Sequence, residues 1–180
     1  MAVTKKEMVK RISEEMGITQ ISAKKLFDSF FEELKDLLVQ GESFSEIGFG
    51  TFYTEEQEPR NGFNPTTKKR MIIPRQIKLH FRPSDERRMS NGQDKIFLDE
   101  IAERLAEKTA NEPEVAKEFI HTLFEIIGDE LMSEERVPVY QFGVFKKSYV
   151  EAREGRNPNT GDELTLPAHY RVHFSPSENV

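Results

Sequence analysis

Residues 153–161 read REGRNPNTG, a polar stretch with an Asn-Pro pair at its centre and two arginines on its N-terminal side. Proline and asparagine both favour tight turns. Residues 60–68, which lie 93 positions earlier, read RNGFNPTTK and keep the Asn-Pro pair and the threonine two residues after it. The repeated turn predicts that the chain holds two copies of one structural unit.

The repeat extends far beyond the turn and needs no gap. FGTF at 49–52 matches FGVF at 142–145, and HF at 80–81 matches HF at 173–174. We therefore divide the chain into unit 1 (residues 1–83), a polar linker (84–94) and unit 2 (95–180). Two copies are too few for a solenoid, so duplication of a dimer-forming domain is the more natural interpretation.

Each unit is expected to begin with two helices. Thr4 and Glu7 form a capping-box pattern that opens a short helix ending near Gly17. A second helix starts around Thr19 and stops at Gly41, and Asn111 or its neighbour is expected to cap the second helix of unit 2. Apolar residues at a 3–4 spacing predict a buried stripe at 23, 26, 27, 30, 31, 34 and 38, and all seven stay apolar 93 positions later.

Strands follow the helices in both units. Ser43–Phe52 and Val137–Phe145 are rich in aromatic and β-branched residues, and a bend is expected at the Phe-Gly pairs 49–50 and 142–143. Tyr53–Ile73 and Lys146–Leu166 then read as strand, Asn-Pro turn and strand. These segments are long and mostly polar, so they are expected to project as two-stranded ribbons. The fold class is α+β.

Composition limits the kinds of function. The chain has 180 residues, no cysteine and a net charge of −6, so disulfides and thiolate metal sites are excluded. Acidic residues are concentrated in the segment 94–140, which holds thirteen acidic and five basic residues. Residues 51–79 instead hold six basic and three acidic residues. The sequence shows no phosphate loop, metal spacing or catalytic motif, so we expect no enzyme, metal or cofactor. Without an apolar run or secretory signal, the expected location is cytoplasmic.

The pattern resembles the HU/IHF family of bacterial histone-like DNA-bending proteins. The resemblance is carried by FGVF at 142–145, REGRNPNTG at 153–161, Leu166-Pro167 and Phe174-Ser175-Pro176. It implies a helical pair, a three-stranded antiparallel sheet and a protruding β-ribbon arm in each unit, with the C-terminal helix of the family missing or vestigial. It also implies pairing of two units, and the sequence leaves open an intrachain pseudo-dimer or a chain-swapped homodimer.

The same resemblance implies a double-stranded DNA partner, held in the minor groove and bent, in the bacterial nucleoid. Pro65 and Pro158 would insert as rigid wedges between base pairs. The other expected DNA-contacting residues are Arg60, Phe63, Asn64, Lys68, Lys69, Arg70, Arg75, Lys78, Lys146, Lys147, Arg153, Arg156, Asn157 and Arg171. Glutamates along both arms favour weaker binding than that of a basic relative, with preference for bent or distorted DNA.

Plainer interpretations stay open beside these. The two prolines could be ordinary turn residues, the arm cations solvating charge, and His80 and His173 structural side chains. The acidic segment could be a solvated helix face, or it could repel DNA or dock a basic partner. The rival function is an HU-fold structural or protein-interaction module with little DNA affinity, which the net charge of −6 favours.

Overall fold

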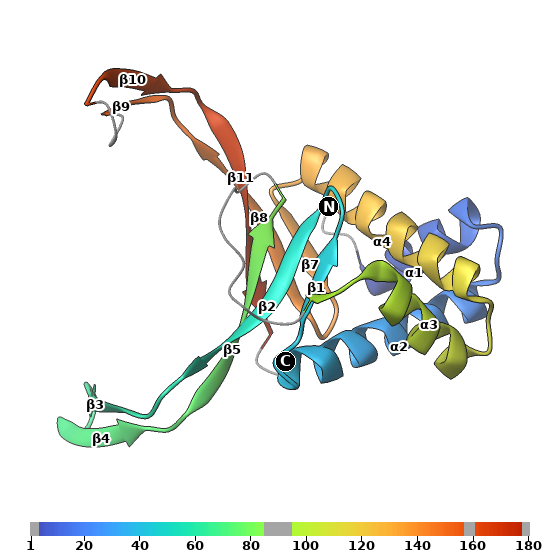
Figure 1. Cartoon of the computed structure of the whole chain (residues 1–180), viewed down its shortest axis with the longest axis horizontal. Helices are drawn as coiled ribbons and strands as arrows, with labels where there is room; N and C mark the ends of the chain where they lie inside the picture. The colour runs from blue at the N-terminus through green and yellow to red at the C-terminus, as the bar shows by residue number, and fades with distance from the viewer. Residues whose placement is uncertain (1–3, 85–94, 157–160, 178–180) are drawn as a thin grey trace.

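The computed structural model describes residues 4–84, 95–156 and 161–177 (Figure 1). Helices gather on one side of the molecule, sheets lie in the middle, and two ribbons project from the opposite side. This arrangement confirms the predicted α+β class with two repeated units. The limits proposed for the units and the linker stay a prediction, and residues 85–94 of the linker lie outside the described residues.

The helices of unit 1 follow the capping signals. α1 (Lys5–Glu15) begins with the complete capping box of Thr4 and Glu7. α2 (Gln20–Val39) begins at Thr19, whose hydroxyl accepts the Ser22 N–H. The helix ends at Val39, and Gly41 follows the cap residue with φ of +86°, a left-handed conformation that suits glycine after a helix.

The helices of unit 2, α3 (Leu98–Thr109) and α4 (Pro113–Ser133), begin without a side-chain cap. Of Asn111 and its neighbour, the neighbour takes the capping position of α4: Glu112 is the N-cap, without a side-chain cap bond. The Asn111 amide instead donates to the Thr109 hydroxyl at 2.9 Å. Pro113 replaces the cap, since its fixed φ suits the first helical position.

One core joins the two units. All fourteen residues of the predicted stripes are 5% exposed or less. Phe30 of α2 is fully buried, and its ring lies 6.1 Å from that of Phe119 and 6.0 Å from that of Phe124, both on α4. The chain thus pairs its units with each other, as an intrachain pseudo-dimer.

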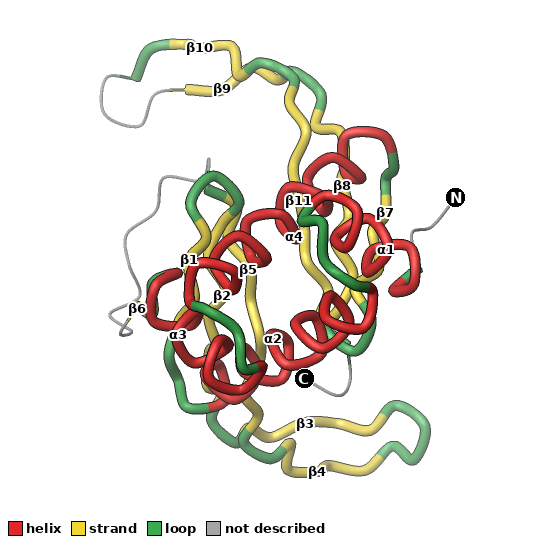
Figure 2. The backbone as a smooth tube through the Cα atoms, turned by 90° about the vertical axis from the view of Figure 1, so that its right-hand side faces the viewer, coloured by secondary structure: helices red, strands yellow, loops and turns green. Residues whose placement is uncertain are grey.

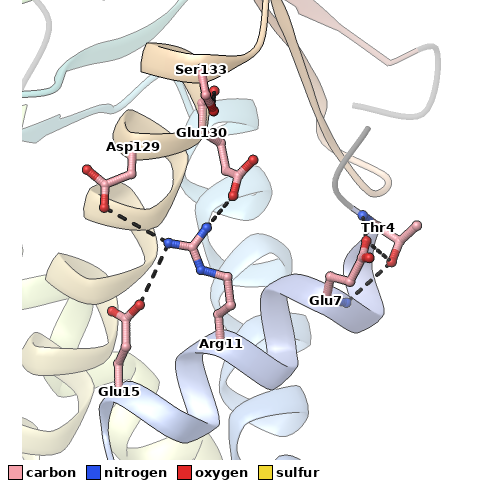
Figure 3. Close-up of polar contacts among 7 residues, drawn as sticks. All are labelled: Thr4, Glu7, Arg11, Glu15, Asp129, Glu130 and Ser133. Carbon is pink, nitrogen blue, oxygen red and sulfur yellow. Dashed lines mark hydrogen bonds and ion pairs between the residues drawn. The ribbon is translucent and has the colours of Figure 1, made fainter. Parts of the chain in front are cut away.

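A polar clamp supports the same pairing at the rim of the core. Arg11 of α1 forms an ion pair with Glu130 of α4, and its guanidinium lies 4.0 Å from Asp129 and 3.8 Å from Glu15 (Figure 3). The arginine is partly exposed, so the clamp adds a modest, salt-sensitive contribution to the apolar contacts.

Two antiparallel sheets cover the helices. In unit 1, β1 (Ser43–Glu46), β2 (Gly50–Gln57) and β5 (Gln76–Pro83) form the order β5-β2-β1. In unit 2, β7 (Arg136–Val139), β8 (Gly143–Val150) and β11 (His169–Pro176) form the order β11-β8-β7. The sheet of unit 1 has one more strand than expected, because β6 (Lys95–Ile96), from the start of unit 2, pairs in parallel with β1 and buries Ile96.

The predicted bends at the Phe-Gly pairs lie slightly too late in the chain. The turns fall at 47–49 and 140–142, where Gly48 and Gln141 take positive φ, and Gly50 and Gly143 open the next strands. Gly143 has a packing role instead. A Cβ placed there would clash with the Phe174 ring and with the Ser175 carbonyl oxygen, so only glycine lets the ring cover the strand.

Candidate nucleic-acid interface

Each sheet continues into a two-stranded ribbon that leaves the body on the side opposite the helices (Figure 1). Seen from the helical side, the two ribbons extend above and below the body (Figure 2). The first arm pairs β3 (Arg60–Asn64) with β4 (Lys69–Ile73), and the second pairs β9 (Arg153–Arg156) with β10 (Glu163–Leu166). Pro74 and Pro167 stand where β4 and β10 stop, because proline cannot donate to the ladder. In each arm, a proline therefore marks the point where the returning strand of the ribbon is interrupted before it enters the sheet.

The first tip is held by its own asparagine. The Asn64 side-chain oxygen accepts the N–H groups of Thr66 and Thr67 at 2.9 and 3.1 Å, and the Lys68 N–H donates to the Asn64 carbonyl at 2.8 Å. Lys68 closes the turn with φ of +53°, and Gly161, at the corresponding position of the second arm, also has a positive φ, of +78°. This turn presents Pro65 at the end of the arm in a fixed backbone shape.

The second tip is described only at its edges. Asn157 and Pro158 lie outside the described residues, so their predicted DNA contacts stay predictions. Arg156 donates from Nε to the Gly161 carbonyl, which ties the two strands together below the tip. Arg153 is exposed at the base of the same arm.

Cations line the outer face of the two sheets, between the arms. Because side chains alternate along a strand, buried Leu79 and Phe145 place Lys78 and Lys146 on the face turned away from the helices. Arg171 shares this face, since it lies opposite Ser148 in the β8–β11 register. Three predicted residues that are far apart in sequence thus meet on one surface.

Two further arginines on this face were missed by the sequence reasoning. Arg82 lies two residues beyond His80 on β5, and its guanidinium sits 5.1 Å from the centre of the Tyr53 ring. Arg136 pairs directly with Lys146 across β7 and β8. The alternation 78, 80, 82 could have indicated Arg82, whereas Arg136 requires knowledge of the strand register.

Lys147 does not join this face. Its ammonium group donates to the Met132 carbonyl at the end of α4 at 2.9 Å, and it lies 5.2 Å from the centre of the Tyr170 ring.

At the base of the first arm, Arg75 is exposed and forms an ion pair with Glu56. His80 stacks on Tyr53 with ring centres 5.4 Å apart, in keeping with a structural part.

The two arms differ sharply in charge. Residues 59–75 of the first arm hold five basic and no acidic residues, whereas residues 152–168 of the second hold two basic and three acidic ones. The returning strand makes the difference, because Lys69 and Arg70 correspond to Asp162 and Glu163. The first arm also exposes Phe63, with 62% of its surface accessible. The first arm is therefore the more cationic and the more apolar of the two.

Within the described residues, no helix is both long and apolar enough to cross a membrane, and no group of side chains is arranged to hold a metal ion.

Comparison with known proteins identifies the repeat. The family model described as "Bacterial DNA-binding protein" matches the chain twice, over residues 3–90 and 98–180. Integration host factor subunit alpha from Xanthomonas campestris pv. campestris is 37% identical over 86 residues, covering 48% of this chain and 87% of the relative. The same subunit from Thioalkalivibrio sulfidiphilus gives the same identity and coverage.

A solved structure is also similar. A cocrystal structure of Anabaena HU with DNA matches 47% of this chain and 91% of its own, with a TM-score of 0.43 and 28% identity. The fold, the arms and the double match together define a non-enzymatic, architectural class of DNA-binding protein. The chain belongs to the bacterial DNA-binding protein family of HU and IHF, as a tandem of two units in one polypeptide.

Proposed function

We propose that this chain bends double-stranded DNA by laying it across the outer face of the sheets while the two arms reach into the minor groove. Pro65 and Pro158 act as wedges between base pairs, and the arm cations contact phosphates. The observation that carries the proposal is the cationic outer face flanked by both arms, with Lys78, Lys146 and Arg171 between them. Contacts of this kind are largely independent of sequence.

The geometry of the first arm supports a wedge role for Pro65. Asn64 fixes the tip through two side-chain bonds, so little backbone entropy remains to be lost when the tip enters a base step. Lys68, Lys69 and Arg70 are exposed around it. The charge difference between the arms further supports unequal contributions, with the first arm supplying most of the phosphate contacts. We also propose that the chain prefers bent or distorted DNA and that it is located in the nucleoid.

Bending is tested by fluorescence transfer between dyes at the two ends of a short duplex. Pro65→Ala combined with Pro158→Ala is expected to lower the transfer at saturating protein, while the control Pro113→Ala, at the start of α4, leaves it unchanged. Unchanged bending by the double variant would show that the wedge mechanism is wrong.

Phosphate contacts are tested by the salt dependence of binding. The slope of log K against log salt is negative, and each lost contact reduces its magnitude by about 0.9. Replacing Lys68, Lys69 and Arg70 with alanine is therefore expected to make the slope less steep by nearly three, whereas exposed Lys24 of α2, replaced in the same way, leaves it unchanged. If wild-type protein shifts neither linear nor nicked DNA at low salt, the rival function as a protein-interaction module is favoured.

A further inference from the structure

Two cavities related by the internal repeat lie where one unit meets the other. The first, which we call the lysine pocket, has a volume of about 540 Å³ and is lined by Lys5, Lys35 and the aromatic ring of Tyr140 among others. The second, the acidic pocket, has a volume of about 460 Å³. Their linings correspond at the 93-residue offset in six positions: Asp28 and His121, Phe31 and Phe124, Glu32 and Glu125, Lys35 and Gly128, Tyr140 and Ile47, Gln141 and Gly48.

The lysine pocket holds an ammonium group of the chain itself. Lys5 forms an ion pair with Asp28, and its Nζ lies 4.8 Å from the centre of the Tyr140 ring and 5.6 Å from that of Phe27. Cations are attracted to aromatic faces at this range. The pocket thus shows that its carboxylates and aromatic rings fit a primary ammonium group.

The acidic pocket has lost both lysines. Gly128 stands at the position of Lys35, and Leu98 at that of Lys5. Four carboxylates line the cavity, those of Glu15, Glu46, Glu125 and Asp129, and His121 is the only basic side chain in that lining. Arg11, which is not part of the lining, lies 3.8 Å from Glu15 and 4.0 Å from Asp129, so it compensates only one side of the cavity (Figure 3).

Glu46 is the second, independent sign of a ligand. It is 3% exposed, and one carboxylate oxygen lies 2.8 Å from Nδ1 of His121, whereas the other is buried and has no hydrogen-bond partner among the described residues. The corresponding residue in the other unit is Val139, which is apolar and equally buried. A buried acceptor without a donor is costly, and the contact with His121 accounts for only one of the two carboxylate oxygens of Glu46.

We propose that the acidic pocket binds the ammonium group of an aliphatic amine, with Glu46 and Glu125 as its carboxylate partners and Phe124 as an aromatic wall. A metal ion is a poorer fit, because the described side chains are not clustered at metal-ligand spacing. The cavity volume is at the lower end of the range for small-molecule sites. A free diamine and the side chain of a lysine on another protein present the same ammonium group, and two different probes distinguish them.

Calorimetric titration of the full chain without DNA tests the proposal apart from the DNA-bending function. The probes are 1,4-diaminobutane and, separately, a lysine with blocked amino and carboxyl termini. We expect one site per chain for at least one probe. Heat with the diamine alone indicates a free amine, and heat with the blocked lysine indicates a lysine side chain. Absence of saturable binding by both probes at millimolar concentration would refute the site.

The internal repeat supplies the matched variants. Gly128→Lys restores the lysine of the other pocket, and a Cβ at this position meets no atom within 4 Å, so the helix accepts it. This variant is expected to abolish binding of the probe, while Gly128→Ala keeps it. Glu46→Val, which copies Val139, is expected to weaken binding at least tenfold. Circular dichroism confirms that each variant is folded. Unchanged affinity in folded Gly128→Lys would overturn the assignment.

Discussion

Replacement of Phe30 by alanine tests whether the two units share one core. Phe30 is fully buried and its ring packs against Phe31 and Phe44 of its own unit and against Phe119 and Phe124 of the other. A phenylalanine buries at least about 150 Å², which at about 25 cal/mol per Å² gives about 4 kcal/mol. Measured costs of Phe→Ala in cores are about 3–5 kcal/mol. We therefore expect Phe30→Ala to lower the free energy of unfolding by about 4 kcal/mol.

The assay is urea unfolding followed by circular dichroism and by tyrosine fluorescence. Because the ring contacts both units, we expect a single transition that moves to lower urea as a whole, with both probes coincident. Phe63→Ala is the control: this ring is 62% exposed on the first arm, and its loss should change stability by less than about 0.5 kcal/mol. Two separate transitions, or a loss in Phe30→Ala below about 1 kcal/mol, would refute the shared core.

Four further variants probe single features. Gly143→Ala should cost about 1–3 kcal/mol in urea unfolding, since its Cβ would clash with the Phe174 ring. Gly128→Ala in α4 should stabilise by up to about 1 kcal/mol. Arg11→Ala should cost about 1 kcal/mol at low salt and less in 1 M salt, because its partners are partly exposed. Burial raises the pKa of Glu46 above its ordinary 4.5, so the stability of the wild type falls as pH rises through that higher pKa. Glu46→Gln removes the titrating group, so this variant should lack the loss and be more stable than the wild type at neutral pH. Thermal melts across pH measure both effects.

Much of the fold could be predicted because its signals are local or repeated. The capping box at Thr4 and the glycine at 41 fixed the helix ends through short-range bonds. The stripes were readable because each of the seven stripe positions recurs as an apolar residue 93 positions later. The cap of α4 was predicted only to within one residue, because asparagine favours both a cap and a local turn, and the neighbour Glu112 takes the position.

The rest depended on long-range register. β6 could not be foreseen, since a two-residue strand carries almost no pattern and is defined by its neighbour β1. The opposite orientations of Lys146 and Lys147 follow from strand alternation, yet which of them faces outward depends on buried Phe145. Arg136 joins the outer face only through its pairing with Lys146 across two strands.

Covalent linkage of the two units makes their pairing independent of protein concentration. In a family member built from separate subunits, the pair of arms exists only while the subunits are associated, so its population falls as the protein is diluted. Here the core that joins α2 to α4 forms within one polypeptide. Its unfolding midpoint is therefore independent of protein concentration, and a single molecule carries both arms at any copy number in the cell.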